Sequence, residues 1–257
     1  MFDQPLPIGV QLLIFFCLFV LMQIVGEVVF AGIMAAGTQP ELSEIDWTTP
    51  WIVLTRSLFF QLFAFIFALL IFLRITRQKF RDLIYINRFF QIKAILITLL
   101  VFIGGMVVME LLAYVNSWLA EWIPNQYALA NEEEINRIQQ NLLIHDNWRQ
   151  FFYCLVVIGI VTPIAEELVF RGLVMRKLME ASAGKVHFAV IVSSLLFAGM
   201  HFQPLKLLPM IFLGMCLGYV YHYSKDIKYS ILLHFLINTS QIVFYFFWVD
   251  VPQVVTP

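Results

Sequence analysis

Long apolar runs separated by short polar segments dominate the pattern of hydrophobic and polar positions. A helix needs about 20 apolar residues to cross a bilayer, and most of these runs reach that length. Backbone groups in lipid must be satisfied internally, so continuous runs form helices, whereas the strands of a membrane barrel alternate over about ten residues. We therefore predict an all-α fold, a polytopic membrane helix bundle of about seven transmembrane helices. The runs are Ile8–Ala36, Trp51–Leu73, Ala94–Trp118, Phe151–Met175, Val186–Phe202, Leu205–Tyr223 and Tyr229–Val249.

Composition agrees with one membrane domain spanning residues 1–257. Of the 257 residues 61% are hydrophobic and 13% charged, against about 45–50% and about 25% in soluble domains. We divide the domain into an N-terminal three-helix part (1–120), a polar loop (121–150) and a core (151–249). The net charge of −1 offers no basic face, which argues against a nucleic-acid partner and leaves the lipid bilayer as the surrounding partner.

Lysine and arginine gather in alternate loops, and this bias sets the orientation of a membrane protein. The intervening loops are mainly acidic, with Glu132, Glu133 and Glu134 in the segment 121–150. We therefore predict a cytoplasmic N-terminus and an external C-terminus. Residues 254–257 carry no retention signal, so we expect the plasma or bacterial inner membrane. The basic residues are Arg74, Arg77, Lys79, Arg81, Arg88 and Lys93, then Arg176, Lys177 and Lys185, then Lys225 and Lys228.

Two loops have a character of their own. Residues 80–91 mix arginine with aromatic and aliphatic side chains, which predicts an amphipathic helix at the membrane surface. The segment 121–150 is polar, with helix-forming residues around 132–140, and we expect it to lie outside the membrane, over the bundle.

The fourth run holds charged residues that a membrane helix normally excludes. The segment Pro163–Arg171 contains Glu166, Glu167 and Arg171. A charge at bilayer depth costs at least about 2.5–3.5 kcal/mol, so such residues are rare and usually functional, although a structural ion network is the alternative. Glu167 and Arg171 are four residues apart and can pair, whereas Glu166 lies about 100° further round the helix.

Matching polar residues occur in two later runs. Phe197 and His201 end the fifth run, and His234 and Asn238 share a helix face in the seventh. Each histidine by itself fits a hydrogen-bonded core residue, and Asn238 by itself fits a contact between helices. Together with the glutamates, however, they form a polar set that a bundle can bring to one point.

The three motifs E-E-x-x-x-R, F-x-x-x-H and H-x-x-x-N, in this order, resemble the CAAX-protease and bacteriocin-processing family of intramembrane glutamic endopeptidases. That family includes the type II CAAX prenyl endopeptidase. The motif positions are Glu166, Glu167, Arg171, Phe197, His201, His234 and Asn238. The resemblance covers about residues 151–249, and the first 120 residues carry no matching motif.

The resemblance implies an endopeptidase that hydrolyses a peptide bond with a glutamate-activated water. In this reading Glu166 is the general base, assisted by His201, and His234 and Asn238 donate hydrogen bonds to the oxyanion. Arg171 would keep Glu167 ionised and hold the helix. No cofactor and no metal are implied. The substrate would be a peptide or a membrane protein, prenylated in one branch of the family; other members are linked to bacteriocin processing or self-immunity.

Other functions fit the same residues. One glutamate and two histidines are a plausible zinc ligand set, although no H-E-x-x-H motif is present. A non-catalytic scaffold or immunity protein would keep the fold for binding, and a transporter would use the carboxylates and histidines as a proton relay. Substitution of Glu166 separates these classes, because it would abolish cleavage, binding or flux respectively.

Other features are read as structural. Glu27, Arg56 and Glu110 lie towards the outer ends of their runs and are expected to be structural partners near the membrane surface. The pair Gly214 and Gly218 permits close packing of the sixth helix.

Overall fold

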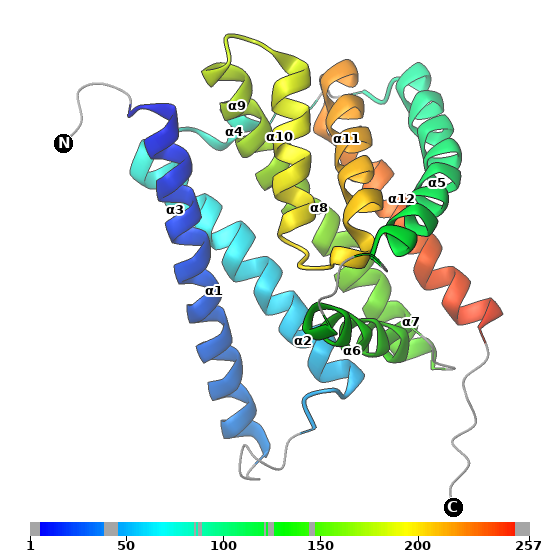
Figure 1. Ribbon diagram of the computed structural model, residues 1–257. Coiled ribbons are helices and arrows are strands. Elements are labelled where there is room, and N and C mark those ends of the chain that lie inside the picture. The colour runs from blue at the N-terminus through cyan, green and yellow to red at the C-terminus, as the bar shows by residue number, and fades with distance from the viewer. Residues whose placement is uncertain are drawn as a thin grey trace, which may run out of the picture.

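The described part of the chain folds into a bundle of helices (Figure 1). The structure is a computed structural model that describes residues 6–38, 46–84, 86, 89–120, 122, 126–143 and 147–249. Within these residues there is no strand. The helices are α1 (Ile8–Thr38), α2 (Pro50–Phe60), α3 (Ala68–Thr76), α4 (Phe80–Leu83), α5 (Ile92–Ala120), α6 (Gln126–Leu143), α7 (Trp148–Cys154), α8 (Thr162–Glu167), α9 (Arg176–Ala181), α10 (Val186–Gly199), α11 (Leu207–Ser224) and α12 (Ile227–Trp248).

Several of these helices join into longer ones through wider π-helical turns. The segment Gln61–Phe67 links α2 to α3, and Leu155–Val161 and Leu168–Met175 link α7, α8 and α9 into one continuous helix. A short 3₁₀ turn, Pro204–Lys206, precedes α11. Isolated π turns inside α-helices occur frequently at functional sites.

The lengths of the helices confirm a polytopic membrane bundle. Six are long and apolar enough to cross a bilayer, and the fifth apolar run forms the shorter helix α10 within the described chain. The six are Ile8–Gly37, Pro50–Thr76, Ile92–Leu119, Trp148–Ala181, Pro204–Ser224 and Ile227–Trp248.

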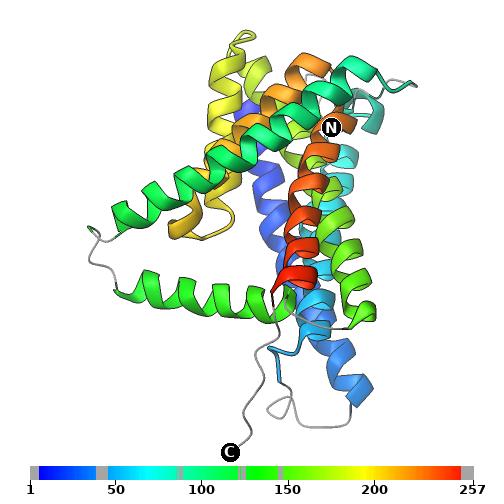
Figure 2. The same ribbon diagram turned by 90° about the vertical axis from the view of Figure 1, so that its right-hand side faces the viewer.

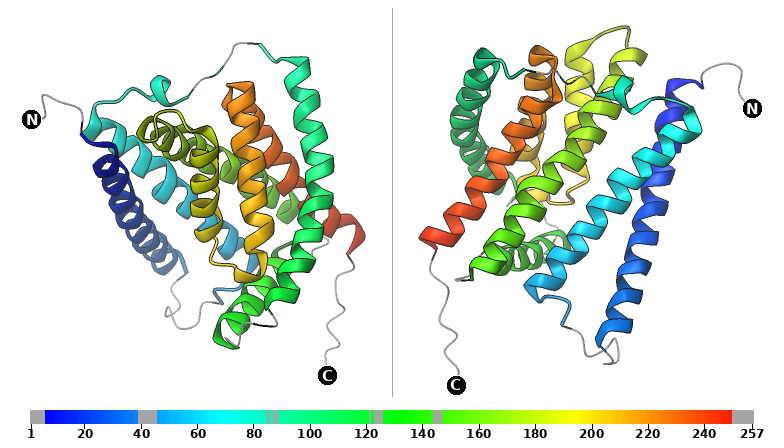
Figure 3. Two further views of the ribbon diagram at one scale, coloured as in Figure 1. Left: turned by 45° about the horizontal axis from the view of Figure 1, so that its top comes forward. Right: turned by 180° about the vertical axis from the view of Figure 1, so that it is seen from behind.

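The continuous helix α7–α9 lies at the centre of the bundle. Seen from behind, it passes between α12 on one side and the α2–α3 helix on the other (Figure 3). Helices α10 and α11 pack in front of it, α1 packs on α2–α3, and α5 packs on α11 and α12. Helix α6 lies crosswise to the long helices, below the slanting α5 (Figure 2).

The basic loops share one end of the molecule. The start of α1, the end of α3, the turn between α9 and α10 and the turn between α11 and α12 all lie at the top of Figure 1, and α6 lies towards the bottom. This arrangement agrees with the alternation on which the predicted orientation rests. At the α11–α12 turn, Lys225 adopts the left-handed conformation that ends α11, and Asp226 caps the first turn of α12 through the backbone N–H of Lys228.

Aromatic side chains fill the core between the helices. Phe15 and Phe19 of α1 meet Phe65 and Phe72, and Phe170 meets Phe197, all at tilted or edge-to-face angles. The pair Gly214 and Gly218 faces α10, as the packing interpretation expected. A Cβ at Gly214 would lie 3.0 Å from Ser194 Cα, and one at Gly218 would lie 3.1 Å from Val190 Cγ1.

The prediction of an amphipathic helix over residues 80–91 is wrong for the residues that the structure describes. Helix α4 covers Phe80–Leu83 only, and the chain then runs in extended and irregular conformations; residues 85, 87 and 88 lie outside the described residues. The physical reason is competition from α12. The Gln91 backbone N–H donates to Tyr229 Oη, and the Phe89 carbonyl accepts from Lys228 Nζ. These backbone groups are therefore bonded to another helix.

Two other expectations about polar segments can be compared with the structure. The helix-forming stretch around 132–140 lies within α6, as predicted. Glu27 and Arg56 pair across α1 and α2 at 2.9 Å, whereas Glu110 is exposed on α5 and forms no ion pair with any residue that the structure describes.

Candidate active site

Pro163 removes one backbone donor from the helix that carries the glutamates, and the side chain of Asn238 compensates. In a π turn the N–H of one residue bonds to the carbonyl five residues earlier, so the missing N–H of Pro163 leaves the Ile158 carbonyl without its helical donor. Asn238 Nδ2 donates to that carbonyl at 2.9 Å. Thr162 Oγ1 donates to the Val157 carbonyl at 3.0 Å. The helix therefore continues through the proline into the glutamate pair.

Glu167 is the centre of a buried polar network. It is completely buried and accepts hydrogen bonds from Arg171 Nη1 at 2.8 Å, from His234 Nδ1 at 3.1 Å and from Ser230 Oγ. Arg171 Nη2 also donates to the Gly214 carbonyl at 3.0 Å. The network thus connects the central helix to α11 and α12, and the predicted pairing of Glu167 with Arg171 is confirmed.

Glu166 has much weaker bonding, although it is also buried, with 6% of its surface exposed. Its Oε1 accepts from Gln61 Nε2 at 3.3 Å, and its Oε2 lies 3.9 Å from His234 Nε2, beyond hydrogen-bond distance. Oε2 has no hydrogen-bond partner among the residues that the structure describes. The two neighbouring carboxylates therefore face different surroundings, as the helix geometry predicted.

His234 lies between the two carboxylates. Its Nδ1 faces an oxygen of Glu167, and a carboxylate accepts hydrogen bonds, so we assign the proton of the neutral ring to Nδ1. Nε2 is then directed towards Glu166. The ring therefore connects the structural carboxylate to the weakly bonded one.

His201 contacts Phe197, whose ring lies beside this cluster. Its Nδ1 bonds to the Phe197 carbonyl at 2.8 Å, which leaves Nε2 for another partner. The Phe197 ring lies 4.8 Å from the His201 ring and 5.9 Å from the His234 ring, and 5.0 Å from Arg171 Cζ. No hydrogen bond joins His201 to Glu166 within the described chain, and the Phe197 ring contacts both motif histidines.

Asn238 lies one helical turn beyond His234 on α12, and its amide donates to the central helix at Ile158. His234 and Asn238 share one face of α12, as their four-residue spacing predicted. Their partners lie on different turns of the central helix, because His234 bonds to Glu167 and Asn238 bonds to Ile158. One Nδ2 hydrogen remains for a second acceptor.

Sequence reasoning missed Gln61 and Ser230. Ser230 precedes His234 by four residues, so Ser230, His234 and Asn238 form one polar stripe on α12, and that spacing was a usable signal. Gln61 is a buried amide in the middle of the second apolar run. Its isolation within that run was its only signal.

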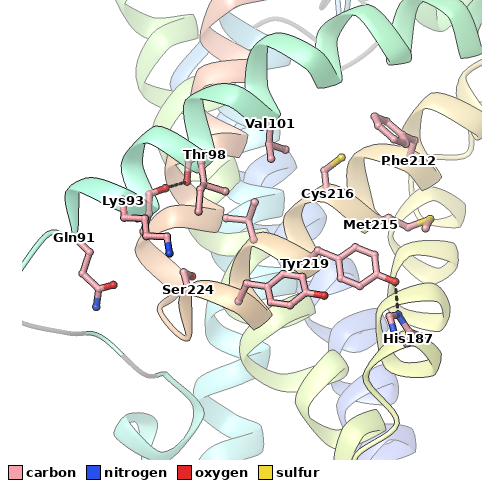
Figure 4. Close-up of a pocket in the computed structure, with 14 residues that line it drawn as sticks. Gln91, Lys93, Thr98, Val101, His187, Phe212, Met215, Cys216, Tyr219 and Ser224 are labelled. Atoms are coloured by element: carbon pink, nitrogen blue, oxygen red, sulfur yellow. Dashed lines mark hydrogen bonds between the residues drawn. The ribbon is translucent and has the colours of Figure 1, made fainter.

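A cavity of the described chain lies away from this cluster. It has a volume of about 850 Å³ and opens between α5 and α11, with His187 of α10 at one side (Figure 4). Most of its lining is apolar, with Lys93, Gln91 and Tyr219 among the polar residues, and His187 Nδ1 bonds Tyr219 Oη at 2.8 Å. Its lining includes none of the motif residues.

A metal site needs several donor side chains that converge on one point. Over residues 6–38, 46–84, 86, 89–120, 122, 126–143 and 147–249, no group of three or more His, Cys, Asp or Glu side chains is arranged to hold a metal ion. The cysteines Cys17, Cys154 and Cys216, all within these residues, form no disulfide with one another.

The cluster lies inside a segment that matches a known family. Residues 148–240 match the family model described as Type II CAAX prenyl endopeptidase Rce1-like. This segment is similar to an Rce1-like domain. It begins at the first residue of α7 and includes all seven motif positions, so the resemblance inferred from the motifs is confirmed. No curated protein and no solved structure matches the chain.

The Rce1-like domain supports a hydrolase of the CAAX-protease type, and the six apolar helices make the protein an integral membrane protein. The helices α1 to α6 lie outside the matched segment, yet Gln61 from the second span contacts Glu166 within it. The polar cluster is therefore built from both parts of the chain.

Proposed function

We propose that the protein is an intramembrane glutamic endopeptidase in which Glu166 activates a water molecule to hydrolyse a peptide bond. The observation that carries the proposal is the difference between the two glutamates. Glu167 is bonded to three side chains, whereas Glu166 has an oxygen that no described residue binds. A general base needs such a free oxygen within reach of the proton that it removes.

In the proposed reaction, Glu166 accepts one proton from water and later returns it to the leaving amine. Glu166 takes a proton from water as the water oxygen attacks the scissile carbonyl carbon, giving a tetrahedral intermediate with a negative oxygen. The proton then passes from Glu166 to the leaving amine as the C–N bond breaks. Burial of the site favours these steps, because it excludes bulk water and strengthens the electrostatic interactions.

The other motif residues receive supporting roles. We assign His234, whose Nε2 is directed towards Glu166, and the remaining amide hydrogen of Asn238 to stabilisation of the oxyanion. His201 assists Glu166 through its unengaged Nε2. Arg171 keeps Glu167 ionised and ties the central helix to α11.

The proposed substrate is a peptide or membrane protein that reaches the site from the bilayer. The family description names a prenyl endopeptidase, so a prenylated CAAX peptide is the first substrate to try. We further propose that the protein resides in a plasma or bacterial inner membrane, with its N-terminus in the cytoplasm.

Peptide mass spectrometry of whole membranes tests this function across many substrates at once. Cells that carry the wild type are compared with cells that carry Glu166→Gln at equal protein level. We expect uncleaved membrane peptides to accumulate in the variant, and the same peptides to be cleaved by purified wild-type protein. Identical peptide profiles in the two strains, together with unchanged cleavage of prenylated peptides, would contradict a protease.

A further inference from the structure

Two buried acceptor atoms, on two side chains of the polar cluster that contact each other, lack hydrogen-bond partners among the described residues. They are Gln61 Oε1 and Glu166 Oε2, on side chains that are 5% and 6% exposed. The two side chains touch through their other polar atoms, because Gln61 Nε2 donates to Glu166 Oε1 at 3.3 Å. Buried polar atoms are nearly always bonded to protein or to ordered water, so two neighbouring unbonded acceptors point to a ligand that donates two hydrogens.

The orientation of the Gln61 amide is the chemically sensible one. Amide nitrogen and oxygen are distinguished by their hydrogen-bond partners. A rotated amide would bring its oxygen against the Glu166 carboxylate, where two acceptors repel. The amide nitrogen of Gln61 is therefore the atom that contacts Glu166 Oε1, and the amide oxygen is left as an acceptor for another donor.

We propose that Gln61 Oε1 and Glu166 Oε2 together bind the water molecule that hydrolyses the substrate, and that Gln61 positions this water. The inference rests on the proposed function and extends it to a residue outside the matched family segment. Water has two hydrogens, and the site offers two acceptors. One O–H donates to Glu166, which removes that proton during attack, and the other donates to Gln61, which holds the oxygen lone pair towards the scissile carbonyl.

An amide suits this second position better than a carboxylate does. It accepts a hydrogen bond as a neutral group, so the Glu166 carboxylate remains the only base that touches the water. Two carboxylates in contact would share a proton, which would remove the free base. Gln61 also begins the π-helical segment Gln61–Phe67, which packs against α8.

The test compares Gln61→Met with Gln11→Met in the purified full-length protein. Methionine has a similar length and no amide. Gln11 is a matched control, since it is 6% exposed and its amide bonds the Leu6 carbonyl and Gln78. We expect Gln61→Met to lower kcat by about 10²-fold, the effect of a misplaced reactant, with KM nearly unchanged. Gln11→Met should leave kcat unchanged.

The outcomes separate the two proposals. Equal kcat for the two methionine variants would overturn the role of Gln61. A Gln61→Met variant that loses activity only in proportion to its folded fraction, measured by thermal unfolding, would also overturn it. If Glu166→Gln keeps wild-type kcat, the proposed function itself fails, whereas an inactive Glu166→Gln beside an active Gln61→Met defeats only the inference.

A second measurement does not depend on any variant. An experimental structure of the wild-type protein at a resolution that shows waters should have one ordered water within about 3.2 Å of both Gln61 Oε1 and Glu166 Oε2. Direct protein contacts to both atoms, with no water between them, would overturn the inference.

Discussion

Adjacent glutamates in one helix have acquired opposite surroundings. Glu167 is bonded on three sides to Arg171, His234 and Ser230, whereas Glu166 keeps one oxygen that no described residue binds. About 100° of rotation around the helix axis is enough to direct the two side chains into different environments. At the residue scale, this difference assigns structure to one carboxylate and proposed chemistry to the other.

The buried pair of Glu167 and Arg171 should dominate stability. We expect Arg171→Ala to lower the free energy of unfolding by about 3–5 kcal/mol, because it leaves a buried carboxylate without its charged partner. Arg56→Ala is the control, since Arg56 pairs with Glu27 at 2.9 Å, close to the 2.8 Å of the buried pair, but with more than half of its side chain exposed. It should cost about 0–1 kcal/mol. Equal losses in denaturant titrations in detergent would show that the buried network is not special.

The sequence was sufficient to predict contacts between residues that lie close together along the chain. The four-residue spacing of Glu167 and Arg171 was sufficient to predict their ion pair. Gln61 lies 105 positions from Glu166 in the sequence, and its contact depends on how α2–α3 packs against α8. Such a contact has no local pattern. Asn238 was assigned to the oxyanion, and its bond to Ile158 was not foreseen, because it follows from the π turn before Pro163.

At the element scale, α12 is the element that organises the polar cluster. Ser230, His234 and Asn238 follow one another at four-residue spacing, and they bond to the central helix at Glu167 and, further back, at Ile158. The order of these partners is reversed along the chain, as two antiparallel helices require. One polar stripe therefore sets both the register of α12 and the surroundings of the glutamates.

Asn238→Ala tests whether this stripe has a structural role as well as a catalytic one. The substitution removes the donor to Ile158, so we expect a lower midpoint of thermal unfolding in addition to slower turnover. Loss of one oxyanion donor lowers kcat by about 10²–10³-fold. A slower enzyme with unchanged thermal unfolding would limit Asn238 to catalysis, and a destabilised enzyme with unchanged kcat would limit it to support of the helix.

The close approach of α10 and α11 gives a second test at this scale. A Cβ at Gly214 would lie 2.8 Å from Ser194 Cβ and 3.0 Å from its backbone Cα, so Gly214→Ala must push the helices apart. We expect a loss of about 1–3 kcal/mol in unfolding free energy, typical of overpacking. In the control Gly104→Ala, the new methyl group meets nothing within 4 Å and should be neutral or stabilising. Thermal unfolding of both variants measures this difference, and equal stability of the two would contradict the close approach of α10 and α11.

For the whole molecule, the apolar pattern was sufficient to predict a polytopic helix bundle and the approximate bounds of its helices. Of the seven predicted runs, six lie in helices long enough to cross a bilayer in the described chain, and the fifth forms the shorter α10. This succeeded because a continuous run of about 20 apolar residues has one stable solution in lipid. The prediction for residues 80–91 was wrong because this segment is short and mixed in composition. Its conformation therefore depends on tertiary contacts, here those with Tyr229 and Lys228. Some helices are longer than their apolar runs because flanking polar residues continue the helix, as in Trp148–Ala181.

The orientation of the molecule in its membrane can be tested by labelling. We expect a cysteine at Lys79 to be protected, and one at Glu134 to react, when intact cells meet an impermeant thiol reagent, because the basic loops are proposed to be cytoplasmic. Both positions are exposed in the folded protein, so access depends on the side of the membrane. Labelling of Lys79→Cys without labelling of Glu134→Cys would reverse the topology.

We propose that the Glu166 carboxylate activates the water without a metal. Single-turnover cleavage of one peptide by chelator-treated wild type, Glu166→Gln and Glu167→Gln tests it most directly, at equal folded fraction. We predict that the treated wild type remains active, that Glu166→Gln is slower by about 10²–10⁴-fold, and that Glu167→Gln keeps a measurable fraction of the rate. Equal rates for the two variants, or activity lost on chelation and restored by zinc, would contradict the account.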